Sequence, residues 1–171
     1  MELRPITPAD VDAVQALIES DPGYTERITG YPPGESDAQS LLMMRPEGLA
    51  EEAKVVLGAF DDGELVAVVD LLRGFPNERT AFIGLLEVHA AYQGRGHGST
   101  TYALVQQYVE TTWPEVRTMR LAVVDTNAQV ATGFWQRQGF EATGEVRPYR
   151  YDKLESKARL YEKQLPEQRR S

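Results

Sequence analysis

Glycine alternates with other residues in a short segment formed by Gly94, Gly96 and Gly98, and the hydroxyl residues Ser99 and Thr100 follow directly. With no side chains in the way, the backbone N–H groups of such a turn can approach a ligand closely. An apolar run precedes the turn and a helical pattern follows it. Unpaired N–H groups and the positive end of a helix dipole favour an anion there. The segment therefore predicts a binding turn for an anion such as pyrophosphate.

Two common phosphate-binding motifs do not fit this turn. A P-loop requires Gly-Lys-Ser/Thr after four spacer residues, and the turn has no such lysine. The dinucleotide fingerprint requires a third glycine where Ser99 stands. Arg95 adds a cationic donor suited to phosphate, with a plain surface arginine as the alternative. A tight turn that binds nothing also stays open for a glycine-rich segment taken by itself.

A carboxylate and a histidine stand two residues apart in the apolar run before the turn. Burial of Glu87 near a cleft would raise its pKa and make it a base, whereas a solvent-facing or ion-paired strand residue is the alternative. His89 shares its strand face by the period of two, and an ordinary imidazole pKa of about 6.5 suits a proton relay, although a strand-end histidine would also fit. His97, inside the turn, fits a cofactor edge or the surface better than catalysis.

The strand, turn and helix together resemble a known family. Segment 85–98 is similar to the signature of the GNAT superfamily of N-acetyltransferases, which is Gln/Arg-x-x-Gly-x-Gly/Ala. Gln93, Gly96 and Gly98 match that signature position for position. The resemblance in the order of elements extends over nearly the whole chain.

A second motif supports the same resemblance. In the superfamily an asparagine leads into a helix that ends in an aromatic pair and Gly-Phe, and Asn127, Phe134-Trp135 and Gly139-Phe140 resemble this pattern with a spacing one residue longer. Many relatives carry a tyrosine where Trp135 stands, and its hydroxyl protonates the leaving thiolate. An indole N–H is a donor without an accessible acid equilibrium, so here the proton has to come from another group.

The resemblance also implies a role for each motif residue. Acetyl-CoA is the implied cosubstrate, and no metal is implied. The backbone of Val88 would meet the thioester carbonyl and the pantetheine arm, the turn amides would cradle the pyrophosphate, and Asn127 would contact the pantetheine or fix the neighbouring strand. The implied cofactor-binding residues are Val88, Gln93, Gly94, Arg95, Gly96, His97, Gly98, Ser99, Thr100 and Asn127.

Amide formation from a thioester needs a neutral amine, a polarised carbonyl and a proton for the departing thiolate. Because the chain has no cysteine, direct attack in a ternary complex is the simplest route, and it is the usual one in the superfamily. Tyr149, Tyr151 or solvent could supply the proton. The two tyrosines would either flank the acceptor cleft or form an exposed aromatic loop. The candidate catalytic residues are Glu87, His89, Tyr149 and Tyr151.

Hydrophobic and turn patterns predict the elements that position these residues. They predict, in order, a strand at 3–6, a helix that starts at Thr7, a long ordered loop over 20–35, a short helix after Ser36, hairpin strands at 54–60 and 64–72, a strand over 80–90, a helix after the glycine turn, a strand at 119–124, a helix at 127–138, and closing strands at 140–143 and 159–164. This order, β-α-α-β-β-β-α-β-α-β-β, indicates an α/β protein. The resemblance makes it a GNAT-like fold with a mixed, mostly antiparallel sheet flanked by helices.

A chain of 171 residues is expected to form a single domain. Residues 1–53 would supply acceptor-side helices and loops, residues 80–140 the acetyl-CoA-binding core, and residues 166–171 a loose tail. No apolar stretch reaches membrane length and the start lacks a signal-peptide layout, so a cytoplasmic protein without a membrane partner is expected. Homodimers are common in the superfamily, and nothing in the sequence decides the oligomeric state.

A net charge of −8 argues against nucleic acid as a partner. The charge is uneven, because residues 1–70 hold 15 acidic and 4 basic side chains and residues 71–171 hold 11 and 14. An acidic front would draw a cationic acceptor, with a solvated surface as the alternative. The leading hypothesis is an N-acetyltransferase acting on a primary amine of a small molecule or peptide. The alternative, motivated by Trp135, is an acetyl-CoA-binding sensor or partner module without the chemistry.

Overall fold

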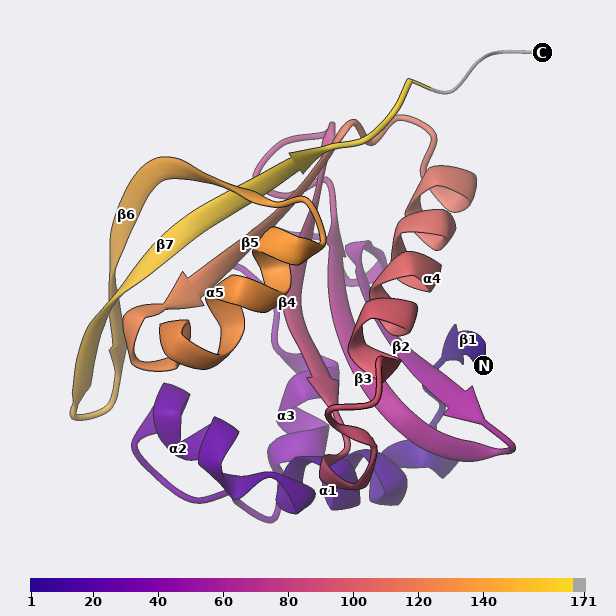
Figure 1. The fold of residues 1–171 in the computed structure, drawn as a ribbon, viewed down its shortest axis with the longest axis vertical. Helices are drawn as coiled ribbons and strands as arrows, with labels where there is room; N and C mark the ends of the chain where they lie inside the picture. Colours follow the sequence, from indigo (N-terminus) through magenta and orange to yellow (C-terminus); the bar gives the residue numbers. More distant parts are fainter. Residues whose placement is uncertain (168–171) are drawn as a thin grey trace.

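A seven-stranded sheet with the order β1-β2-β3-β4-β5-β7-β6 forms the centre of the computed structural model, which describes residues 1–167 (Figure 1). The strands are β1 (Glu2–Pro5), β2 (Lys54–Asp61), β3 (Glu64–Arg73), β4 (Thr80–Val88), β5 (Thr118–Val124), β6 (Glu141–Tyr151) and β7 (Leu154–Gln164). Every neighbouring pair is antiparallel except β4 and β5, which are parallel. The prediction of a mixed, mostly antiparallel sheet is confirmed.

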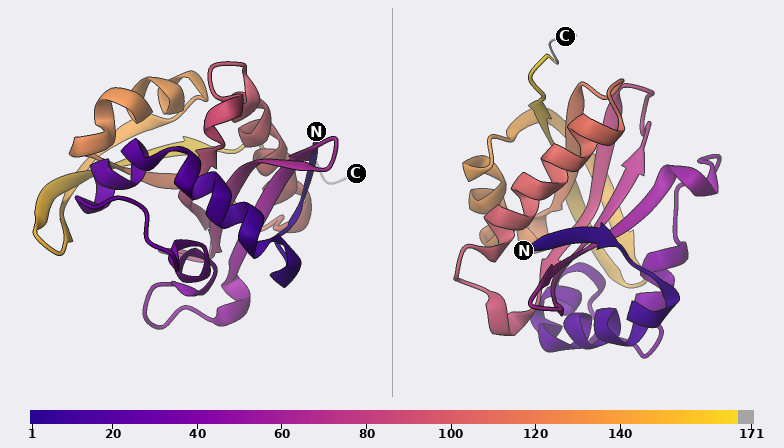
Figure 2. Two further views of the ribbon diagram at one scale, coloured as in Figure 1. Left: turned by 90° about the horizontal axis from the view of Figure 1, so that it is seen from below. Right: turned by 90° about the vertical axis from the view of Figure 1, so that its right-hand side faces the viewer.

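Helices cover both faces of this sheet (Figure 2). The α-helices are α1 (Val11–Ser20), α2 (Pro22–Thr29), α3 (Asp37–Met43), α4 (His97–Thr112) and α5 (Ala128–Arg137), and short 3-10 helices are η1 (Pro8–Asp10), η2 (Glu51–Ala53), η3 (Ala90–Tyr92) and η4 (Asp125–Asn127). One core cluster packs α4 and α5 on one face, with Val105 and Val109 fully buried. The other packs α1 and α3 on the opposite face, around Val14 and Leu17. No helix within residues 1–167 is long and apolar enough to span a membrane.

The prediction of a loop over 20–35 is wrong, because α2 occupies its first half. Pro22 stands at the first helical position, where its missing N–H costs nothing, and Gly30 ends the helix with φ +83°. The same residue types that suggested a loop are therefore the start and stop signals of a short helix. α2 also carries Tyr24 and Arg27, and the Arg27 side chain donates to Asn127.

The closing strands are longer than predicted, since β6 and β7 form one hairpin that extends beyond 140–143 and 159–164. β6 is an edge strand whose residues are mostly exposed, so it lacks the apolar alternation by which a strand is recognised. Tyr149 and Tyr151 accordingly lie in a strand rather than in a loop. The tip of the hairpin lies beside α2 in Figures 1 and 2, where the Tyr149 hydroxyl donates to the Ile28 carbonyl at 2.6 Å.

The parallel pair β4 and β5 separates halfway along its length. Only Thr80–Ile83 is paired with Thr118–Leu121, and Figure 1 shows the two strands diverging toward their carboxyl ends. The register of β3 and β4 shifts at this point, which leaves Gly84 as an extra residue. A Cβ at Gly84 would lie 2.7 Å from the Asp70 carboxylate, so the bulge depends on a residue without a side chain.

The remaining elements agree with the sequence patterns within a few residues. The hairpin of β2 and β3, the strands β4 and β5, and the helices α4 and α5 all lie where predicted. Of the predicted loose tail, residues 168–171 are outside the described residues.

Candidate active site

The separation of β4 from β5 creates a cavity of about 630 Å³, a volume common for small-molecule sites. Its lining residues come from α2 (Tyr24, Ile28), β4 (82–88), the glycine turn and α4 (Gln93, Gly94, Gly96, Gly98, Ser99), β5 (121–124), α5 (Val130, Ala131, Phe134, Trp135, Arg137) and the hairpin (Tyr149, Ala158), together with Asp21 and Asn127. The cavity thus joins the predicted anion-binding turn to the predicted base.

The glycine turn has the backbone shape that its sequence requires. Gly94 and Gly96 have φ values of +74° and +82°, a region that side chains disfavour, and Gly96 caps the start of α4. Gly98 serves a different purpose, because a Cβ there would lie 3.1 Å from the Phe134 ring. α4 and α5 can therefore pack closely beside the cavity while the first-turn N–H groups of α4 stay available to an anion.

Gln93 ties the turn to two other elements. Its side-chain amide donates to the Val88 carbonyl and to Asp21 Oδ2, both at 3.0 Å. These bonds fix the turn against the end of β4 and against the junction of α1 and α2. Gln93 therefore stabilises the glycine turn and also lines the cavity.

The carboxyl half of β4 offers unpaired backbone groups to the cavity. The His89 N–H donates to the Val66 carbonyl at 2.8 Å, so His89 and Val66 form one of the hydrogen-bonded residue pairs along the β3–β4 ladder. Because such pairs alternate along an antiparallel strand, the N–H and C=O groups of Leu86 and Val88 point the other way, toward β5. β5 has already diverged at this level, so an extended ligand with amide groups can pair with these groups, except for the Val88 carbonyl, which accepts from Gln93.

Glu87 is the buried acid of the cavity. It is 5% exposed, and its Oε1 has no hydrogen-bond partner within residues 1–167. Burial, reinforced by the negative charges of Asp21 and Asp37 and opposed by Arg27, raises the pKa of Glu87 to about 8. A carboxyl group with this pKa can take a proton near neutral pH, which is what a general base requires.

The match with known proteins decides the family. The sequence profile of the acetyltransferase (GNAT) family matches residues 16–140, which is most of the chain. The chain belongs to the GNAT acetyltransferase family. Among curated protein sequences none matches it.

Solved structures agree with this GNAT assignment at the level of the fold. An acetyltransferase from Thermus thermophilus is 23% identical, with a TM-score of 0.74 over 96% of each chain. A ribosomal-protein-alanine N-acetyltransferase from Brucella melitensis is 19% identical, with a TM-score of 0.70 over 96% of this chain and 100% of that one. The predicted GNAT fold is confirmed, and the protein is an acetyltransferase by family.

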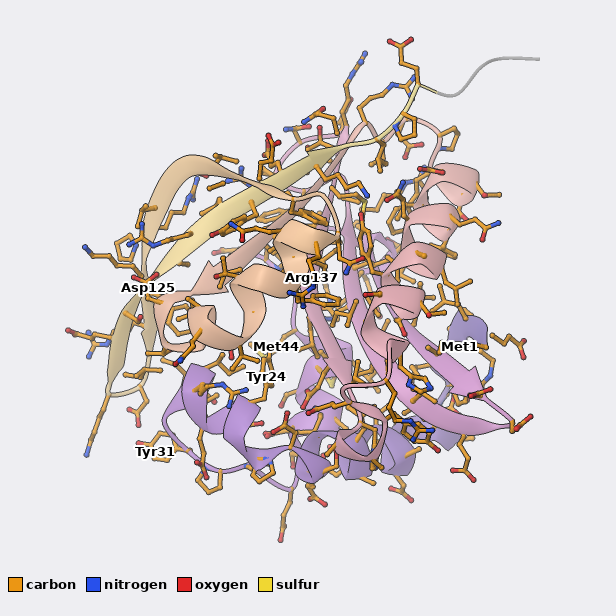
Figure 3. All side chains as sticks on the ribbon, in the orientation of Figure 1. Met1, Tyr24, Tyr31, Met44, Asp125 and Arg137 are labelled. Carbon is orange, nitrogen blue, oxygen red and sulfur yellow. The ribbon has the colours of Figure 1, made fainter. Side chains whose placement is uncertain are left out.

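Acetyl-CoA, which GNAT membership implies, fits the groups found in the cavity. The N-terminal turn of α4 suits the pyrophosphate, and the backbone N–H and C=O of Leu86 together with the N–H of Val88 suit the amides of the pantetheine arm. Arg137, which the sequence analysis missed, is the only cationic side chain among the described lining residues. It forms no ion pair with any part of the chain in residues 1–167. In Figure 3, Arg137 lies at the end of α5, beside the cavity.

Five predicted residues lie outside the lining of the cavity, namely His89, Arg95, His97, Thr100 and Tyr151. Arg95 donates to the Ala91 carbonyl at 3.3 Å and stacks over the Tyr92 ring. His89 accepts from the Ala91 N–H, and His97 Nδ1 lies 3.1 Å from the Tyr92 carbonyl. The Thr100 hydroxyl donates to the Gly96 carbonyl. β4 ends at Val88, so His89 lies one residue beyond the strand.

The two predicted tyrosines separate in the structure. Tyr149 lines the cavity, whereas Tyr151 is 47% exposed and is not a lining residue. Tyr24, on the missed helix α2, lines the cavity as well and lies below Arg137 in Figure 3. Burial raises the pKa of Tyr24, and the negative charge of Glu87 raises it further.

Asn127 and Trp135 both line the cavity, and each also contacts other side chains of the protein. Asn127 Oδ1 accepts from Arg27 Nε at 2.8 Å, which links the start of α5 to α2. Trp135 is 8% exposed and packs edge to face with Phe134, Phe140 and Tyr102. The tryptophan that replaces the tyrosine of many relatives is therefore an aromatic core residue.

Proposed function

We propose that the protein transfers an acetyl group from acetyl-CoA to a primary amine of a small molecule or peptide, by direct attack in a ternary complex. The observation that carries this proposal is Glu87, whose unpartnered Oε1 is buried in the same cavity as the turn of α4. The chain has no cysteine to form an acyl-enzyme.

In this proposal each element of the cavity has one task. The turn amides and Arg137 hold the phosphates, and the backbone of β4 aligns the pantetheine arm. Acetyl-CoA supplies the activated thioester. Glu87 removes the proton that the amine loses as the new N–C bond forms, and a pKa of about 8 suits that transfer near neutral pH.

The surroundings of Glu87 favour a cationic acceptor. Asp21 and Asp37 act on Glu87 as negative charges, and residues 1–70, which supply both of them, are strongly acidic. A second positive charge on the acceptor would find a counter-charge there. The Brucella relative is named for a protein alanine, so peptide amines belong in the test panel beside small diamines.

A catalytically inactive acetyl-CoA sensor is the second candidate, because Trp135 cannot act as an acid. The test is release of the CoA thiol with acetyl-CoA and a panel of diamines, polyamines and short peptides. Turnover of at least one amine, lost in Glu87→Gln, is the expected result. Tight binding of acetyl-CoA with no thiol release across the panel would instead favour the sensor.

A further inference from the structure

The departing thiolate needs a proton, and the cavity contains two phenols that could supply one. Tyr24 comes from α2 and Tyr149 from β6, and both line the cavity with Glu87. A phenol has a single O–H to donate. The hydrogen bonds that each phenol already makes therefore decide between them.

The proton of the Tyr149 hydroxyl is already used in a hydrogen bond within the protein. Its hydroxyl donates to the Ile28 carbonyl at 2.6 Å, a short bond that joins the hairpin to α2. To protonate a ligand, Tyr149 would have to give up this bond and leave a backbone carbonyl without its partner. Tyr149 therefore stabilises the position of α2 against the hairpin.

Tyr24 is free to donate. Its hydroxyl makes no hydrogen bond with any group in residues 1–167. Burial and the neighbouring carboxyl group of Glu87 raise the pKa of Tyr24, which keeps the phenol protonated throughout the neutral range. The ring is fixed by its place in the first turn of α2, which starts at Pro22 and is held to η4 by the bond from Arg27 to Asn127.

We propose that Tyr24 is the proton donor to the CoA thiolate, a role that rests on the proposed acetyl transfer. The amine nitrogen bonds to the acyl carbon, the C–S bond breaks, and its electron pair leaves with sulfur. Glu87 takes one proton from the nitrogen, and Tyr24 gives one to the sulfur. Transfer of the proton from Glu87 to the Tyr24 phenolate then restores both groups, and the products are the amide and the free thiol.

This pairing gives complementary tasks to Glu87 and Tyr24, which line the same cavity. The carboxyl group with a pKa of about 8 accepts the proton that the phenol later recovers. Neither task requires Trp135, whose ring is enclosed by other aromatic side chains. The acid thus comes from α2 rather than from α5.

The experiment measures how strongly the rate depends on the leaving thiol in wild type and in Tyr24→Phe. Two donors are compared, S-acetylpantetheine and an acetyl aryl thioester, whose thiol is far more acidic and needs no proton to leave. With the pantetheine donor, kcat/KM of Tyr24→Phe is expected to fall by about 10² to 10³-fold. With the aryl donor the loss should be within about threefold, because the acid is then superfluous.

Tyr149→Phe is the comparison variant, and it should keep the wild-type ratio between the two donors whatever its rate. Calorimetric titration with acetyl-CoA should give Tyr24→Phe the wild-type affinity. An equal loss with both donors, or no loss with either, would overturn the assignment of Tyr24. Failure of the wild-type protein to turn over any amine would instead overturn the proposed function itself.

Discussion

Glu87 is the residue on which the chemistry depends. Glu87→Gln keeps the size of the side chain and removes the base, so kcat should fall by about 10² to 10⁴-fold while acetyl-CoA affinity is unchanged. In wild type, kcat/KM for the acceptor should rise with pH through about 8 as Glu87 loses its proton. Measuring kcat/KM against pH for two amines of different pKa separates the rise caused by Glu87 from the rise caused by deprotonation of the amine. If the pH at which kcat/KM rises changed entirely with the pKa of the amine, the role of Glu87 would be contradicted.

The same carboxyl group should make folding stability depend on pH. Its folded pKa of about 8 lies above its ordinary value of 4.5, so the folded protein binds more protons between these values, and stability falls as the pH rises across that window. Each pH unit of the window corresponds to about 1.4 kcal/mol. Glu87→Gln should therefore melt above wild type at pH 9 and show little gain at pH 4. An equal difference at both pH values would contradict the burial of the charge.

Arg137 is expected to hold a phosphate of acetyl-CoA. Loss of one charge-assisted contact costs about 1.5–3 kcal/mol, so Arg137→Gln should raise the Kd for acetyl-CoA by about 10 to 100-fold. S-acetylpantetheine lacks the phosphates, and kcat/KM for it should not change. Arg95→Gln is the matched control, because that side chain stacks on Tyr92 outside the cavity. A larger increase in the Kd from Arg95→Gln than from Arg137→Gln would assign the phosphate contact to Arg95, as the sequence predicted.

Single residues were predictable where their neighbours in sequence carry the signal. Glu87 stood out as the one acid in an apolar strand, and the glycine turn has a local spacing pattern. Arg137 and Tyr24 had no such signal, because they reach the cavity only through the packing of α5 and α2. Tyr149 and Tyr151 share a strand face by the period of two, and the position of the hairpin along the cavity, which no local pattern encodes, places Tyr149 but not Tyr151 in the lining.

At the scale of elements, the bulge in β4 lies where β4 separates from β5. Gly84→Ala places a Cβ 2.7 Å from the Asp70 carboxylate, which is held by Lys54 at 3.0 Å. Overpacking at such a site costs about 1–3 kcal/mol. Gly133→Ala in α5 is the control, where only the flexible end of Arg137 is near and helix propensity predicts a gain of up to about 1 kcal/mol. Urea denaturation of both variants checks this, and equal destabilisation would contradict it.

The elements were predicted best where apolar periodicity is strong. β2, β3, β4 and α4 contribute to the core clusters and were placed correctly. α2 was missed because proline and glycine act as helix boundaries as well as helix breakers, and only the packing of the helix shows which. The separation of β4 from β5 results from non-local pairing, which no local pattern encodes.

At the scale of the whole molecule, the uneven charge should control how the acceptor binds. If residues 1–70 steer a cationic amine, kcat/KM for a diamine should fall steeply as ionic strength rises from about 0.01 to 0.15 M, where the Debye length shortens from about 30 to 8 Å. A monoamine analogue that lacks the second positive charge, assayed in parallel, should show a weaker response. Identical salt dependence for both acceptors would contradict steering.

The central claim, that the turn of α4 in the cavity binds acetyl-CoA, is tested most directly by isothermal titration with acetyl-CoA. The comparison is Gly96→Asp against Gly96→Asn, which place nearly identical side chains on the same left-handed backbone, in open space, and differ by one negative charge. Wild type and Gly96→Asn should bind, and Gly96→Asp should lose about 10-fold or more in affinity by repulsion of the pyrophosphate. Equal affinity of the two variants, or no binding by wild type, would contradict the account.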